Sequence, residues 1–198
     1  MEGRILSCAE NLFLGKGYNQ TSMTEIAKQA GCTQALVHYY FRTKENLFSK
    51  IFDEKLRLFL DSVVDETDEK LPFEEMVAVR TTRLYDIMAA NPKLPFMFMS
   101  EFLINPKQRG TIRNSLMDAC GSAVSRLGER IRVEVENGRI RKTSSMEITL
   151  NMFSLVVTFF VFLPFLEEVG IVDAANRDAF MEERKAEIIK TIIGSLRP

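Results

Sequence analysis

The chain has 198 residues, of which 46% are hydrophobic and 27% are charged, a balance typical of a globular protein with a sizeable core. Its formal net charge of −1 excludes a uniformly basic protein; the first 50 residues carry +2 (6 basic, 4 acidic) and the remainder −3 (20 basic, 23 acidic). Cys8, Cys32 and Cys120 form neither a disulfide framework nor a metal-ligand pattern, so we expect no metal, no cofactor and a reducing cytoplasmic location.

The spacing of apolar residues in the first 50 positions predicts three helices. The first covers about 5–13 and ends at the glycines that follow it. A capping box at Ser22 starts a short second helix, which Gly31 ends. A third helix at about 33–41 follows a very tight turn, with Thr33 as its expected cap. We therefore predict a three-helix unit at the N-terminus.

Helical spacing continues to the C-terminus, and no strand or hairpin pattern interrupts it. The predicted segments are a helix from Thr43 to about 63, a polar link at 65–70, a helix at 72–90, a short apolar piece at 95–103, a long helix at 108–136, an apolar helix capped by Ser144, and a last helix at 176–196. The sequence therefore predicts an all-α protein of about nine helices.

Residues 148–166 form a 19-residue stretch without a charge, which is the length threshold for a membrane span. Four polar residues are scattered through it, Pro164 interrupts it, and it lacks the flanking basic or tryptophan anchors of membrane helices. A helix that is apolar on most faces can also be buried between helices or between two subunits. We favour burial, and we expect no membrane contact.

The second and third predicted helices have the pattern of a helix-turn-helix, because a turn of about three residues that contains Gly31 joins them. Val37 and Phe41 lie four residues apart, so they share the face that anchors the third helix to the other two. The remaining positions point away and mix amide, hydroxyl, imidazole and phenol groups. Such side chains suit base edges and phosphate oxygens in a major groove.

An ordered set of residues runs through the segment 12–48: Phe13, Gly17, Tyr18, Thr21, Ser22, Ile26, Ala27, Ala30, Gly31, Tyr39, Tyr40, Phe41, Thr43, Lys44, Glu45, Leu47 and Phe48. In this order and spacing the segment resembles the DNA-binding region of the TetR family of bacterial ligand-responsive transcriptional regulators. The resemblance implies a DNA-binding domain at 1–50 and a ligand-binding and dimerisation domain at 51–198. Over residues 51–198 the resemblance is one of architecture only.

The resemblance also implies roles for individual residues. The positions where the family reads bases are Gln34, Ala35, Leu36, His38 and Tyr39. The positions where it meets phosphates are Tyr40 and Lys44, with Thr21, Ser22 and Thr33 at helix N-termini whose N–H groups can face phosphate. Relatives usually have Thr or Asn where this chain has Leu36, and Leu-Tyr where it has Val37-His38, so the operator sequence cannot be read by analogy.

Simpler interpretations remain for several of these residues. Cys32 and His38 lie six positions apart, about 240° around a helix, so they diverge and do not form a nucleophile and base. His38 can be a structural histidine, and Lys44 taken alone would be a solvated charge. With no paired catalytic groups in the sequence, we expect the protein not to be an enzyme.

Phenylalanine and methionine are concentrated at 94–103 and 146–165, where the family has its ligand cavity. These residues can fill a core or line an adaptable apolar pocket. The candidate ligand-binding residues are Phe59, Arg83, Met97, Phe98, Glu101, Phe102, Met152 and Phe153.

The expected function is that of a sequence-specific DNA-binding transcriptional regulator, a repressor released from its operator by a small, largely apolar or amphipathic ligand. A single helix-turn-helix unit makes few contacts with DNA, so we expect the protein to be a homodimer that the two C-terminal helices form. The homodimer is expected to bind an inverted-repeat operator in double-stranded DNA. The alternative is an all-α carrier of hydrophobic ligands that does not bind DNA.

Overall fold

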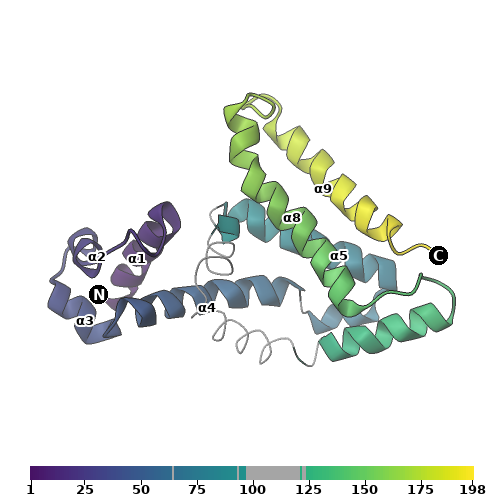
Figure 1. Ribbon diagram of the computed structural model, residues 1–198, viewed down its shortest axis with the longest axis horizontal. Helices are drawn as coiled ribbons and strands as arrows, with labels where there is room; N and C mark the ends of the chain where they lie inside the picture. The colour runs from purple at the N-terminus through teal and green to yellow at the C-terminus, as the bar shows by residue number, and fades with distance from the viewer. Residues whose placement is uncertain (64, 93, 97–120, 122–123) are drawn as a thin grey trace. The chain divides into compact units, whose positions relative to one another are not determined.

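The computed structural model describes residues 1–63, 65–92, 94–96, 121 and 124–198, apart from the side chains of 58–63 and 66. Those ranges contain helices and no strand, so the predicted all-α fold class is confirmed (Figure 1). The elements are α1 (Glu2–Lys16), α2 (Met23–Ala30), α3 (Gln34–Phe41), α4 (Lys44–Val63), the 3-10 helix η1 (Glu66–Lys70), α5 (Phe73–Ala90), α8 (Ser145–Glu168) and α9 (Arg177–Gly194).

Short side-chain caps start several of these helices, as the sequence predicts. The hydroxyl of Ser22 accepts the N–H of Glu25 at 3.2 Å, and that of Ser144 accepts the N–H of Glu147 at 3.2 Å. Each cap binds an N–H group that would otherwise lack a partner in the first helical turn. The first helix continues through Gly15 to Lys16 and ends at Gly17, the second of the two glycines predicted to end it, where φ is 85°.

The middle of the chain differs from the sequence prediction at 65–70. This segment, expected to be a polar link, forms η1, because the side chain of Asp65 accepts the N–H of Thr67 at 2.9 Å and starts a tight turn. The predicted piece at 95–103 and the first part of the helix at 108–136 lie mostly outside the described residues. Residues 124–136 are helical.

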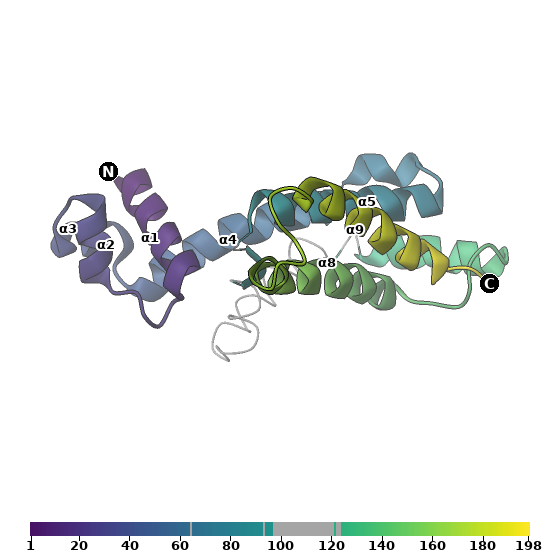
Figure 2. The same ribbon diagram turned by 90° about the horizontal axis from the view of Figure 1, so that it is seen from above.

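The chain divides into two compact units, and the division falls within α4. One unit contains Met1–Leu58, and the second contains Phe59–Pro95 and the described residues from 121 onward. In the first unit α2 packs against both α1 and α3 (Figure 2). Its core is made of apolar side chains spaced three or four apart on each helix: Ile5, Ala9, Phe13, Ile26, Ala30, Val37, Phe41, Leu47 and Phe48.

In the second unit α5, α8 and α9 pack against one another in pairs (Figures 1 and 2). Tyr85 lies at the centre of this unit, where its ring stacks on Phe159 at 5.9 Å and its hydroxyl donates a 2.8 Å hydrogen bond to the carbonyl oxygen of Met181. Burial and this bond fix α5 to both of the other helices.

The helix α8 is long and apolar enough to cross a membrane, with a mean hydropathy of 2.1, and 39% of its most apolar window is buried within the chain. Core helices of soluble proteins satisfy the same criterion. Burial of α8 is therefore partial within one chain. Its uncovered apolar residues are Met146, Leu150, Phe162 and Phe165.

Candidate nucleic-acid interface

The turn between α2 and α3 requires glycine at one position. Gly31 has a φ of 62° and a ψ of 41°, a left-handed conformation that L side chains rarely adopt. Its N–H donates to the carbonyls of Ala27 and Lys28, and the guanidinium of Arg4 occupies the place where a Cβ would stand. The left-handed backbone favours glycine here, and a Cβ would also require the flexible end of Arg4 to move. This glycine allows a turn of three residues to join α2 to α3.

The helix α3 has one buried face and one exposed face. Val37 and Phe41 are buried, which confirms that they anchor the helix to the unit. Four of the five predicted base-reading residues are exposed: Gln34, Ala35, His38 and Tyr39. Leu36 is half-buried. The structure therefore presents most of the predicted base-reading residues on the surface of α3.

Two tyrosines extend this surface toward the end of α3. The side chain of Tyr39 is 78% exposed, and Tyr40 is 39% exposed. Their rings meet edge to face with centroids 5.4 Å apart. Two large aromatic groups held exposed by a short helix are unusual for a soluble surface, and they suit stacking or hydrogen bonding to another molecule.

A chain of hydrogen bonds runs across the exposed face of α3. The hydroxyl of Thr24 on α2 donates to Oε1 of Gln34 at 3.0 Å. Nε2 of Gln34 lies 3.3 Å from Nε2 of His38, and Nδ1 of His38 lies 2.8 Å from the carbonyl oxygen of Arg42. Sequence patterns do not indicate that Thr24 contributes to this surface, because its hydrogen-bond partner lies on a different helix.

The helix N-termini that were predicted to face phosphate differ in exposure. Ser22 and Thr33 are exposed and cap α2 and α3, and Thr33 accepts the N–H of Leu36 at 3.3 Å. Thr21 is only 2% exposed, and its hydroxyl donates to the carbonyl of Gly17 at 2.9 Å. The side chain of Thr21 therefore stabilises the turn before α2 and is not part of the exposed surface.

Lys44 starts α4 but turns inward. Its ammonium group donates hydrogen bonds of 3.0 Å to the carbonyl oxygens of Tyr18 and Thr21, and it lies 4.1 Å from the centroid of the Tyr18 ring. Two of its three N–H donors are thus used inside the N-terminal unit. One donor remains for an anion, so the phosphate contact of Lys44 stays a prediction.

The candidate ligand residues are only partly described. The side chains of Phe59, Met97, Phe98, Glu101 and Phe102 lie outside the described part of the structure. On α8, Met152 is buried and Phe153 is half-buried.

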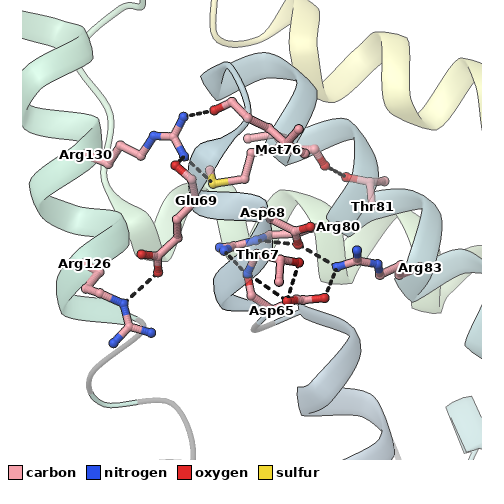
Figure 3. A network of polar contacts seen from close by, with 12 residues as sticks. Asp65, Thr67, Asp68, Glu69, Met76, Arg80, Thr81, Arg83, Arg126 and Arg130 are labelled. Carbon is pink, nitrogen blue, oxygen red and sulfur yellow. Dashed lines mark hydrogen bonds and ion pairs between the residues drawn. The ribbon is translucent and has the colours of Figure 1, made fainter.

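Arg83 on α5 pairs with two carboxylates of the segment around η1 (Figure 3). Its Nη1 lies 2.6 Å from Asp68 and 3.3 Å from Asp65. Hydrogen bonds from Thr67, together with the nearby Arg83, hold the pKa of the Asp65 carboxyl below its usual value. An arginine paired in this way is less available to a ligand than a free one.

A buried arginine that sequence patterns did not single out belongs to the same network (Figure 3). Arg80 is 7% exposed, and its Nε lies 3.5 Å from Asp68. Burial lowers its pKa, which the charge of Asp68 partly offsets. From the helix at 124–136, Arg130 donates to the carbonyl of Glu69 at 2.9 Å, and Arg126 pairs with the Glu69 carboxylate at 2.6 Å. The network fastens η1 to two helices of the second unit.

An open groove runs between α8 and α9, and its lining is largely apolar. The residues around it are Ser154, Leu155, Thr158, Phe159, Phe162, Leu166, Phe180 and Arg184. Across the residues that the structure describes, no group of three or more His, Cys, Asp or Glu is placed to hold a metal ion.

Part of the chain is similar in sequence to known bacterial regulatory proteins. Residues 5–51 match the model for bacterial regulatory proteins of the tetR family. The fatty acid metabolism regulator protein of Bacillus subtilis (strain 168) is 26% identical over 98 residues, 50% of each chain. The regulator QacR of Staphylococcus aureus (strain Mu50) is 40% identical over 53 residues, 27% of this chain and 28% of QacR. The chain therefore matches about half the length of these relatives or less.

Two solved structures share the fold over the whole chain. The regulator FadR of Bacillus subtilis in complex with stearoyl-CoA has a TM-score of 0.70, with 17% identity over 100% of both chains. The fatty acid degradation regulator FadR of Bacillus halodurans has a TM-score of 0.67, with 18% identity over 100% of both. At these identities the likeness establishes the all-helical fold and leaves the ligand to be argued separately.

Proposed function

Because its residues 5–51 match the model for bacterial regulatory proteins of the tetR family, we propose that this chain represses transcription at an inverted-repeat operator and is released by a small, largely apolar ligand. The observation that carries the proposal is the surface of α3, where Gln34, His38 and Tyr39 are exposed while Val37 is buried. A catalytic role is not part of the proposal, and the expected compartment is the cytoplasm.

The size of the helix α3 and the position of its exposed residues suit binding in a DNA major groove. An α-helix fits the roughly 12 Å width of that groove, and its first turn approaches the base edges. Gln34 starts α3, so its amide lies in that first turn, while the capped N-termini at Ser22 and Thr33 suit contacts with the flanking phosphates.

In a dimer, the second subunit supplies a second helix-turn-helix unit. The exposed Phe162 and Phe165 on α8, 56% and 59% exposed, continue the apolar lining of the groove beside α9. Exposed aromatic residues of this kind on a helix pair are typical of a surface covered by another helix pair. We propose that α8 and α9 pack against their symmetry mates as a four-helix interface.

The ligand is expected to be apolar over most of its length. Met152 and Phe153 remain candidate residues of the ligand-cavity wall in the second unit, together with the candidates that lie outside the described side chains. One relative is a regulator of fatty acid metabolism, and one structure of the same fold was solved with stearoyl-CoA, so a long-chain acyl thioester is the first compound to test.

Release requires the ligand to favour one of two arrangements of the dimer. The helix α4 belongs to both units, so it can transmit a change from the ligand-binding unit to the helix-turn-helix unit. A coupling of about 1–3 kcal/mol would change operator affinity roughly 5- to 150-fold. A ligand that bound both arrangements equally would change nothing.

The test is fluorescence anisotropy of labelled duplexes from the upstream region of the protein's own gene, titrated at several salt concentrations. We expect preferential binding to a duplex that contains an inverted repeat, with an affinity that falls steeply as salt rises. Adding stearoyl-CoA should then lower the affinity. A protein without any sequence preference, which nonetheless binds acyl thioesters, would instead be a carrier and would overturn the proposal.

A further inference from the structure

We propose that Thr24, on α2, is a positioning residue for base recognition, and that it fixes the amide of Gln34 so that Gln34 reads an adenine. The inference rests on the proposed function, because it concerns how the same face of α3 selects its operator. The carrying observation is the chain of three hydrogen bonds from Thr24 through Gln34 and His38 to the carbonyl of Arg42.

The carbonyl of Arg42 determines which atoms donate and which accept along this series of hydrogen bonds. A carbonyl oxygen only accepts, so Nδ1 of His38, 2.8 Å away, must carry a proton and donate it. In the neutral imidazole the other nitrogen then has a lone pair and no proton. Nε2 of His38 is therefore an acceptor.

The tautomer of His38 fixes the orientation of the Gln34 amide. An acceptor at Nε2 needs a donor 3.3 Å away, so the nitrogen of the amide must face the imidazole. The oxygen of the amide then faces the other way, toward Thr24, whose hydroxyl donates to it at 3.0 Å. If the amide were turned over, two acceptors would meet at His38.

The groups left free on Gln34 match one base. After these two bonds the amide of the exposed Gln34 retains one N–H donor and one oxygen lone pair. In the major groove adenine offers an N7 acceptor beside an N6 donor, and a glutamine amide pairs with both at once. Guanine offers two acceptors there, and no amide satisfies both with this arrangement.

Thr24 contributes by preparing this geometry before DNA arrives. An exposed glutamine has several rotatable bonds, and holding it in one orientation removes an ordering cost from binding. Thr24 is exposed on α2, so its side chain has no core to fill, and its hydroxyl is the group that acts. Because the bond is exposed, we expect its effect to grow when the groove excludes water.

The experiment compares Thr24→Val, which removes the hydroxyl at nearly constant size, with Thr24→Ser, which keeps it. Duplexes selected by the wild-type dimer from a random library define the operator, and each position is then replaced by the other bases and by 7-deazaadenine. We expect a position where wild type prefers adenine about 5- to 150-fold, where 7-deazaadenine is disfavoured, and where Gln34→Ala abolishes the preference.

At that position Thr24→Val should reduce the preference about 2- to 12-fold, and Thr24→Ser should restore it. In a Gln34→Ala background Thr24→Val should change nothing further, because Thr24 acts through Gln34. Equal weakening of all sequences, persisting in that background, would show that Thr24 contacts the DNA backbone and would overturn the inference. An unchanged preference would also overturn it. If wild type selects no sequence at all, the proposed function itself fails.

Discussion

The ammonium group of Lys44 lies 4.1 Å from the centroid of the Tyr18 ring and donates a 3.0 Å hydrogen bond to the carbonyl oxygen of the same residue. A second bond of 3.0 Å reaches the carbonyl of Thr21. Lys44 is the first residue of α4, and both partners belong to the turn between α1 and α2. One side chain therefore ties the start of α4 to the part of the N-terminal unit that positions α2.

Replacing Lys44 with alanine should destabilise the protein and weaken its binding to all DNA sequences alike. Hydrogen bonds from a charged donor contribute more than neutral ones, and partial exposure reduces that contribution. We expect the free energy of unfolding to fall by about 1–2 kcal/mol. Urea denaturation measures the stability, and anisotropy at several salt concentrations measures DNA binding.

Lys50→Ala, on the same helix, is the matched control. Lys50 pairs with Glu2 at the surface, with both side chains substantially exposed, so its loss should affect stability less than the loss of Lys44. If Lys44→Ala left stability unchanged and lowered the slope of log affinity against log salt by about 1, Lys44 would be a phosphate contact alone.

Replacing Tyr39 with alanine should lower operator affinity without lowering stability. Tyr39 is 78% exposed, so folding gains little from it, whereas a base contact is worth about 1–3 kcal/mol. Anisotropy on operator and on scrambled duplex should show the loss mainly on the operator, and thermal denaturation should show no shift. An equal loss on both duplexes would instead identify Tyr39 as a backbone contact.

The parts of the helix-turn-helix unit that the sequence could predict are those set by neighbours along the chain. The caps at Ser22, Thr33 and Ser144 depend on residues three positions away, so their pattern is visible in the sequence. The burial of Val37 and Phe41 follows from their helical spacing in the same way. Helix types and most helix limits were predictable for this reason.

The parts that could not be predicted depend on contacts across the fold. Thr24 and Gln34 belong to different helices, and Lys44 reaches back 26 positions to Tyr18. Arg80 and Asp68 lie twelve positions apart in a segment that gives a periodic signal only for α5. Such pairs form only when tertiary packing brings the helices together, so no local sequence pattern indicates them.

The stability of the second unit should decrease in alkaline solution through Tyr85. Burial raises the pKa of Tyr85 well above its ordinary value of 10.0, so the folded protein keeps the proton where the unfolded chain releases it. Stability from this group is complete below the unfolded pKa and is lost as pH rises above about 10. Thermal denaturation between pH 8 and 11 should show the fall.

Two phenylalanine variants separate this effect from general alkaline denaturation. Tyr85→Phe should cost about 1 kcal/mol at neutral pH, because it loses the bond to Met181, and its stability should depend less on pH above 10. Tyr39→Phe removes an exposed phenol and should leave the pH dependence as in wild type. Identical alkaline profiles for wild type and Tyr85→Phe would contradict the assignment.

Replacing Phe162 with glutamate should separate the proposed dimer into folded monomers. The residue is 56% exposed in one chain and lines the groove beside α9, so the chain can fold without it, whereas a dimer would bury it twice. Loss of two phenylalanine contacts worth about 1.5–3 kcal/mol each should raise the dissociation constant at least 100-fold. Analytical ultracentrifugation measures the dissociation constant of the dimer, and operator affinity should fall as the dimer dissociates because two half-sites are no longer bound together.

The control is Val133→Glu, which changes an exposed apolar residue on the helix at 124–136. A Phe162→Glu protein that stayed dimeric would exclude this surface as the interface.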